Sequence, residues 1–102
     1  MKKFYVLYSP EANIDLENLS DVIMYKYKAP LTAKKYIFGL RTEINRLSIL
    51  ADSLPFYSRP QLIKYGANTK RLNYKEMTII FAVYGKIAYI HRVIPANTLT
   101  EI

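Results

Sequence analysis

The stretch MTIIFAVYGKIAYIHRVI, residues 77 to 94, decides the fold of this chain. Both of its halves are rich in β-branched and aromatic residues, and Tyr84-Gly85-Lys86 separates them. Such residues favour strands, and a glycine in a short connection favours a hairpin. The sequence therefore predicts two antiparallel strands, Met77 to Tyr84 and Lys86 to Ile94, joined by a tight turn.

Two further strands are predicted outside this hairpin. Residues 70 to 74 form a short β-like run directly before it, and residues 3 to 8, KFYVLY, form another at the start of the chain. The first strand ends at Ser9-Pro10, where Ser suits a helix N-cap and Pro the first helical position. Residues 53 to 69 contain two prolines and a glycine without periodicity, which predicts a long ordered loop.

Two amphipathic helices are predicted between the first strand and this loop. Apolar residues recur at helical spacing over two segments, at Ala12, Leu16, Leu19 and Ile23, and at Ala33, Ile37, Leu40, Ile44, Leu47 and Ala51. The acidic residues of the first helix are expected on its solvent side: Glu11, Asp15, Glu17 and Asp21. The short Lys28-Ala29-Pro30 link predicts a helical hairpin. Gly39 inside the second helix costs up to about 1 kcal/mol relative to Ala, and we expect close backbone contact to compensate this cost.

The order of elements defines the predicted fold class. It is α+β, with the order β-α-α-β-β-β and an N-terminal helical hairpin packed on one face of a mostly antiparallel sheet. With 102 residues, the chain is the size of one domain, so we expect residues 1–102 to form a single domain. The sheet face opposite the helices is expected to be partly open and to be a candidate binding surface.

Charge indicates a polyanionic partner, either nucleic acid or an acidic protein segment. Of the net charge of +7, residues 1 to 52 carry +2 (eight Lys/Arg against six Asp/Glu) and residues 53 to 102 carry +5 (seven against two). A solvated basic surface without a partner is the alternative. The chain has no cysteine and no apolar run near the roughly 20 residues of a membrane helix, so we expect a soluble, cytoplasmic protein without membrane contact.

Several kinds of site are not expected. The three glycines are too far apart for a phosphate loop, and one histidine without cysteine cannot supply a metal site. A hydrolase triad lacks its nucleophile context and an acid after His91. We therefore predict neither a metal nor a cofactor.

Basic and aromatic residues of the second half form the remaining candidate site, since cations neutralise phosphates and aromatic rings stack on bases. They are Arg59, Lys64, Tyr65, Lys70, Arg71, Tyr74, Lys75, Tyr89, His91 and Arg92. Strict alternation along the last strand would put His91 and Arg92 on opposite faces. Because an unpaired Arg is harder to bury than a neutral His, we expect Arg92 on the open face and His91 as a structural residue.

Nearly the whole chain resembles the RelE/ParE toxins of type II toxin–antitoxin (plasmid stabilisation) systems. The resemblance rests on the order of elements and on short motifs: SPEA at residues 9 to 12, AKKYIFGLRTEINRL in the second helix, then RLNY, MTIIFAVYG and HRVI. It implies a small toxin held inactive by a cognate antitoxin, an acidic small protein that covers the basic sheet face and the helices. ParE-like members poison DNA gyrase, and RelE-like members cleave mRNA on the ribosome without a metal.

The resemblance also implies site residues. Arg71 in RLNY matches the basic residue on the first strand after the loop, and Arg92 in HRVI matches an arginine common in the ParE-like branch. The candidate binding residues are then Lys64, Lys70, Arg71, Tyr74 and Arg92. If the chain is an enzyme, the candidate catalytic residues of a metal-independent endoribonuclease are Arg71, Arg92, His91 and Lys64.

The tail favours the ParE-like alternative. After the last strand, PANTLTEI contains no cation, whereas RelE-like nucleases continue there with Arg or Lys. Cleavage of RNA requires a base, an acid and cationic stabilisation of the developing charge. A ParE-like inhibitor is therefore expected, with a RelE-like nuclease, or a degenerate member that keeps only antitoxin binding, as alternatives. Target and oligomeric state stay open.

Overall fold

The computed structural model describes residues 3–99, and its elements follow the predicted order. They are β1 (Tyr5–Tyr8), α1 (Pro10–Asp21), the π-helical turn η1 (Val22–Lys26), α2 (Pro30–Asn45), α3 (Leu47–Leu50), the 3₁₀ turns η2 (Ala51–Ser53) and η3 (Pro60–Tyr65), β2 (Lys70–Tyr74), β3 (Met77–Tyr84), β4 (Ile87–Pro95) and the 3₁₀ turn η4 (Ala96–Leu99). The structure confirms the predicted α+β fold class.

A four-stranded sheet of order β1-β4-β3-β2 forms the centre of the fold. β3 pairs antiparallel with both β4 and β2, whereas β1 pairs parallel with β4. The turn between β3 and β4 has two residues, and Gly85 adopts a φ of 60° in it, which a residue with a side chain rarely adopts. The hairpin predicted from residues 77 to 94 is therefore confirmed.

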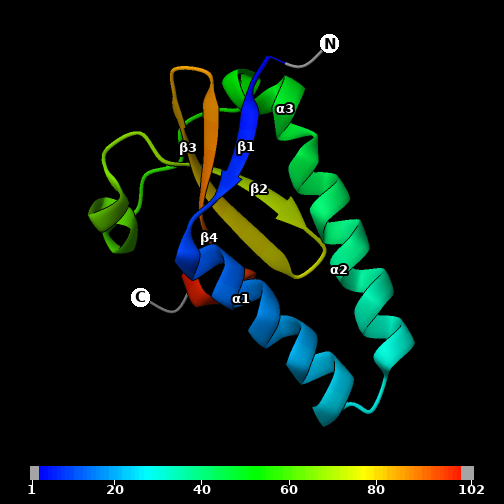
Figure 1. Ribbon diagram of the computed structural model, residues 1–102. Helices are drawn as coiled ribbons and strands as arrows, with labels where there is room; N and C mark the ends of the chain where they lie inside the picture. The colour runs from blue at the N-terminus through cyan, green and yellow to red at the C-terminus, as the bar shows by residue number, and fades with distance from the viewer. Residues whose placement is uncertain (1–2, 100–102) are drawn as a thin grey trace.

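The helical hairpin covers one face of the sheet, and the hairpin tip projects beyond the strands (Figure 1). Its predicted apolar stripes supply the core: Ala12 and Leu16 of α1, and Leu40 and Ile44 of α2, are buried against Phe81 and other inward side chains of the strands. Leu47 and Ala51 continue the stripe beyond the end of α2. The predicted second helix is thus interrupted near Arg46 without losing its apolar face.

The start of α1 is fixed by Ser9, as predicted. Its hydroxyl accepts a hydrogen bond from the Ala12 N–H at 2.9 Å and donates one to the His91 carbonyl at 2.8 Å. A side-chain cap satisfies an N–H that the helix itself leaves unpaired. Ser9 therefore joins the helix start to β4 as well as capping it.

The predicted loop of residues 53–69 crosses the other face of the sheet. It contains the turn η3, whose buried Leu62 packs on Ile80 of β3, and Phe56 forms an isolated bridge with Lys70. This face is consequently covered over Ile80 and open around it. Within residues 3–99, no helix is long and apolar enough to cross a membrane.

Gly39 lies where α2 touches β2. A Cβ atom at this position would overlap the hydroxyl of Tyr74, whose ring packs edge-on against Tyr36 of α2 at 5.6 Å between centroids. The contact at Gly39 is therefore close, as expected, but it is made with a tyrosine side chain and not with the backbone of a neighbouring element. It explains why the helix interior keeps a glycine here.

We expect Gly39→Ala to lower the free energy of unfolding by about 1–3 kcal/mol, the usual cost of overpacking, although Ala is the better helix former. Tyr74→Phe removes the hydroxyl, so Gly39→Ala should cost less in that background. Denaturant melts of the two single variants and the double variant measure this coupling. Equal costs of Gly39→Ala in both backgrounds would contradict the contact.

Candidate functional site

A β-bulge in β4 places both His91 and Arg92 on the sheet face opposite the helical hairpin, here called the second face. Ile80 pairs with Arg92 and Phe81 with Ile90, which leaves His91 as the extra residue. Before the bulge Ile90 faces the helical core, and after it Val93 does. The expectation that the two side chains lie on opposite faces is therefore wrong, because strict alternation fails at a bulge.

Arg92 is held by Asp15 of α1. Its Nε donates to Asp15 Oδ2 at 2.7 Å and its Nη2 to Oδ1 at 2.9 Å, while Nη1 donates to the Tyr65 hydroxyl at 3.3 Å. These hydrogen bonds raise the pKa of Arg92, and those to Asp15 have the largest effect. Asp15 Oδ2 also accepts from the Val93 N–H at 2.9 Å. Asp15 was expected on the solvent side of α1, but its side chain is only 12% exposed and neutralises Arg92.

His91 lies in a cluster of tyrosines. Its ring centroid is 5.0 Å from those of Tyr65 and Tyr89 and 6.2 Å from that of Tyr84, and its Nε2 is 3.2 Å from the Tyr84 hydroxyl. Burial lowers the pKa of His91, and the carboxylate of Glu11 opposes this shift only in part. The ring is therefore neutral at pH 7, as expected for a structural histidine, although it lies on the second face.

Two arginines pack on the ring of Tyr57 at the β2 side of the second face. The guanidinium carbons of Arg71 and Arg59 lie 4.1 Å and 4.4 Å from its ring centroid. Arg71 pairs with Ile80 in the sheet, as Arg92 does from the other side, so both arginines flank one buried isoleucine. Cations over an aromatic ring are attracted to its face and keep their charge exposed. Arg59 and Arg71 are thus available to an anionic partner.

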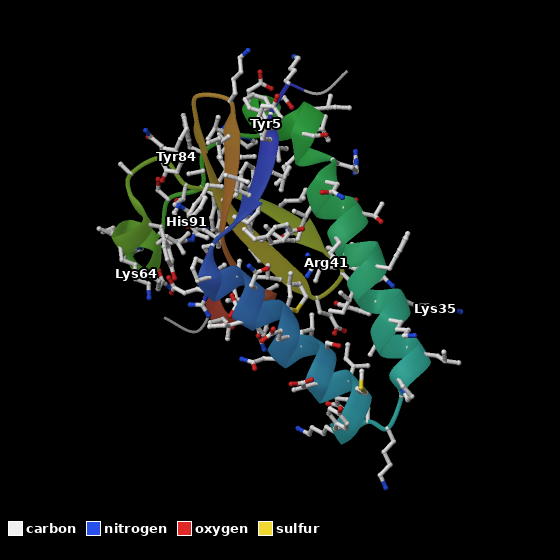
Figure 2. All side chains as sticks on the ribbon, viewed as in Figure 1. Tyr5, Lys35, Arg41, Lys64, Tyr84 and His91 are labelled. Atoms are coloured by element: carbon white, nitrogen blue, oxygen red, sulfur yellow. The ribbon has the colours of Figure 1, made fainter. Side chains whose placement is uncertain are left out.

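Lys64 lies on η3 above the same face. Its Nζ is 5.2 Å from the Tyr65 ring centroid, and Figure 2 shows it on the same side of the molecule as His91 and Tyr84. Lys64, Tyr65, Arg92 and Ile94 line a hollow of about 280 Å³ between η3 and β4. His91 does not line this hollow, but Lys64, His91 and Arg92 all contact Tyr65.

Two predicted binding residues lie on the helix-covered face instead. Lys70 is 6% exposed, and its Nζ donates to the carbonyl oxygens of Ala51 at 3.0 Å and Asp52 at 3.4 Å, at the end of the helical segment. A cation at a helix C-terminus is a common structural arrangement. Tyr74 packs against α2 as described above. Neither side chain reaches the second face.

Asp15, Tyr57 and Tyr84 contribute to this site, and sequence reasoning did not select them. Asp15 follows the polar positions of an amphipathic helix, and nothing in the sequence indicates that β4 has a free N–H opposite it. Tyr57 lies in the aperiodic loop, where no pattern gives its direction. Among residues 3–99, no group of three or more His, Cys, Asp or Glu side chains is placed to hold a metal ion.

The Asp15–Arg92 pair should contribute to stability. We expect Asp15→Asn to lower the free energy of unfolding by about 2 kcal/mol, less than the roughly 3–5 kcal/mol of a fully buried pair, because the Arg92 side chain is 29% exposed. Glu17→Gln, an exposed charge change on the same helix, should stay within about 0.5 kcal/mol of the parent. Equal effects of both substitutions in denaturant melts would argue against the pair.

Stability should fall as pH drops below the ordinary His pKa of about 6.5. The folded pKa of His91 is lowered, so between the unfolded and folded pKa values the unfolded state binds more protons, and stability rises with pH there. Thermal melts between about pH 5 and 7.5 measure this dependence. His91→Gln should flatten the curve of stability against pH just below the pKa that His91 has in the unfolded state. An unchanged curve would rule out His91 as the source of the pH dependence.

Comparison with known proteins shows a likeness in fold. No family model matches the sequence, and no curated protein matches it. Among solved structures, the chain is similar to a chain described as the chromosomal ParDE TA system from P. aeruginosa, with a TM-score of 0.76 and 18% sequence identity. The match covers 91% of this chain and 96% of that chain. At this identity, the two chains share a fold.

Proposed function

We propose that this chain is the toxin component of a type II toxin–antitoxin system, a ParE-like growth inhibitor that binds a target such as DNA gyrase. The observation that carries the proposal is its fold, which it shares over nearly the whole chain with a chain of the ParDE TA system. The short motifs that resemble RelE/ParE toxins agree with this assignment, while no family model matches the sequence. A cognate acidic antitoxin would neutralise the protein.

The second face supports binding more than catalysis. Cleavage of RNA at the 2′-hydroxyl needs a base, an acid and cations around the developing charge. The charge of Arg92 is compensated by Asp15, and Lys70 lies on the other face. The described part of the tail adds the polar residues Asn97 and Thr98, while Thr100 and Glu101 lie outside the described residues.

Arg59 and Arg71 support an acidic partner on this face. Both keep their charge exposed over Tyr57, and none of the ion pairs among residues 3–99 involves either of them. Complementary charge speeds association and makes it depend on salt. An acidic antitoxin segment would pair with these two arginines at the β2 side of the second face.

A RelE-like endoribonuclease is the second candidate, and His91 favours it. Its neutral ring on the second face and the Lys64 ammonium both contact Tyr65, and together they would offer a base and a cation. A degenerate member that keeps only antitoxin binding is the third candidate. These alternatives differ in what the purified protein does to DNA gyrase and to ribosome-bound mRNA.

We expect the purified protein to inhibit DNA supercoiling by gyrase and to leave mRNA on translating ribosomes intact. Adding the proposed acidic antitoxin should relieve the inhibition. Arg71→Glu should weaken this relief, because it reverses a charge on the proposed antitoxin surface. Gyrase assays and primer extension on ribosome-bound mRNA provide the two readouts.

Lys86→Glu is the matched control, since it makes the same charge change in the exposed β3–β4 turn, away from the second face. Relief by the antitoxin should be unchanged in this variant. Ribosome-dependent cleavage that disappears in His91→Ala would replace the proposal by the nuclease. Antitoxin binding without gyrase inhibition and without mRNA cleavage would support the third candidate, a degenerate member that keeps only antitoxin binding.

A further inference from the structure

A second basic, exposed surface lies outside the second face, on the hairpin tip. The tip is defined as residues 22–35, which include η1, the connection to α2 and the first turns of α2. Residues 11 to 21 contain four acids and no Lys or Arg, whereas residues 22 to 42 contain five Lys or Arg and no acid. Charge therefore changes sign along the hairpin, and the tip carries only positive charge.

All four lysines of the tip, Lys26, Lys28, Lys34 and Lys35, are exposed. The ion pairs found within residues 3–99 are Arg46–Glu43 and Arg92–Asp15, and neither involves the tip. The tip projects away from the sheet in Figure 1, and Figure 2 shows Lys35 pointing outward from α2. The four charges are thus uncompensated by the protein and accessible from solvent.

Large side chains are exposed among these lysines. Tyr25, Tyr27 and Leu31 are 70%, 65% and 74% exposed, and Lys26 Nζ lies 5.8 Å from the Tyr27 ring centroid. Tyrosine combines an apolar ring with a hydroxyl that donates hydrogen bonds. Such side chains can contact sugars and phosphate oxygens while the lysines neutralise phosphates.

Lys28 adds an independent observation. It adopts a φ of 51°, in the left-handed region that favours glycine. Gly at this position would remove the strain, yet the chain has a lysine here. Backbone strain of this kind clusters at functional sites, and it also occurs at Lys75 in the β2–β3 turn, with a φ of 52°.

We propose that the hairpin tip binds the phosphate backbone of duplex DNA. An acidic protein helix is less suited to it, because such a helix needs a groove for its apolar stripe. Lys34 and Lys35 line the grooves that flank Phe38 on α2, whereas Lys26 and Lys28 line neither groove. The end of the hairpin that carries Lys26 and Lys28 projects away from the sheet (Figure 1). The inference does not depend on the function proposed above, since it concerns another surface and another class of partner.

Salt dependence tests the proposal. We expect a fluorescently labelled duplex of about 20 base pairs to bind with a log–log salt slope of about −3.6, from about −0.9 for each of four phosphate contacts. Affinity would then fall on the order of 100-fold between about 50 and 200 mM salt. Lys26→Gln combined with Lys28→Gln should make the slope shallower by about 1.8. Fluorescence anisotropy at several salt concentrations measures these slopes.

Lys3→Gln combined with Lys86→Gln is the matched control, because it removes the same charge beside β1 and in the β3–β4 turn, at the other end of the molecule (Figure 1). This variant should keep the parent slope. Equal losses in both double variants would show non-specific attraction to a basic protein and overturn the proposal. Undetectable binding at the lowest salt concentration would overturn it too, as would tighter binding of polyglutamate than of DNA by the tip.

Two single variants separate charge from contact and from folding. Tyr27→Ala should weaken DNA binding without changing the salt slope, because it removes no charge. Lys28→Gly should raise the melting temperature, because glycine adopts the positive φ of this position without strain. It should also make the salt slope shallower by about 0.9, because it removes one charge. A Lys28→Gly variant that melts higher and binds DNA as the parent does would contradict the role of this lysine.

Discussion

The partly unpaired edge of β4 is the constraint on which the rest of the structure depends. β1 pairs with β4 only from Ile87 to Ile90, so the following backbone groups of β4 have no strand partner on that side. α1 takes the place of the missing strand. Ser9 donates to the His91 carbonyl, and Asp15 accepts from the Val93 N–H. Since buried backbone groups need partners, this arrangement fixes where α1 lies and therefore where the whole hairpin packs.

The same edge determines the chemistry of the second face. The bulge turns His91 and Arg92 toward one side, and Asp15 reaches around the edge to bind Arg92 in a two-point ion pair. A carboxylate that satisfies a backbone N–H thus also cancels the charge of an arginine. The cations left exposed on this face are those that rest on Tyr57 and Tyr65. The uncompensated cations of this face therefore lie on the loop, on η3 and on β2, whereas the arginine of β4 is paired with Asp15.

Charge in this protein is organised by structural element more than by position in the sequence. Comparing the two halves of the chain makes the second half the basic one, because the acids of α1 offset the lysines that follow it. In the structure, α1 uses one of its acids on Arg92, while the hairpin tip presents its lysines alone. The molecule consequently has two separate basic surfaces, one rich in arginine and aromatic contacts, the other rich in exposed lysine. Surfaces of such different character suit different partners.

The sequence by itself determined the element order, the apolar faces of both helices, the Ser9 cap and the β3–β4 hairpin. These features depend on local spacing and on residues close in the chain, so periodicity reveals them. Only the tertiary structure decided the site: that Lys70 and Tyr74 face the helices, that His91 and Arg92 share a face, and that Asp15 neutralises Arg92. Ion pairs between residues 77 positions apart and a one-residue bulge leave no periodic signal, because they arise from how the elements meet.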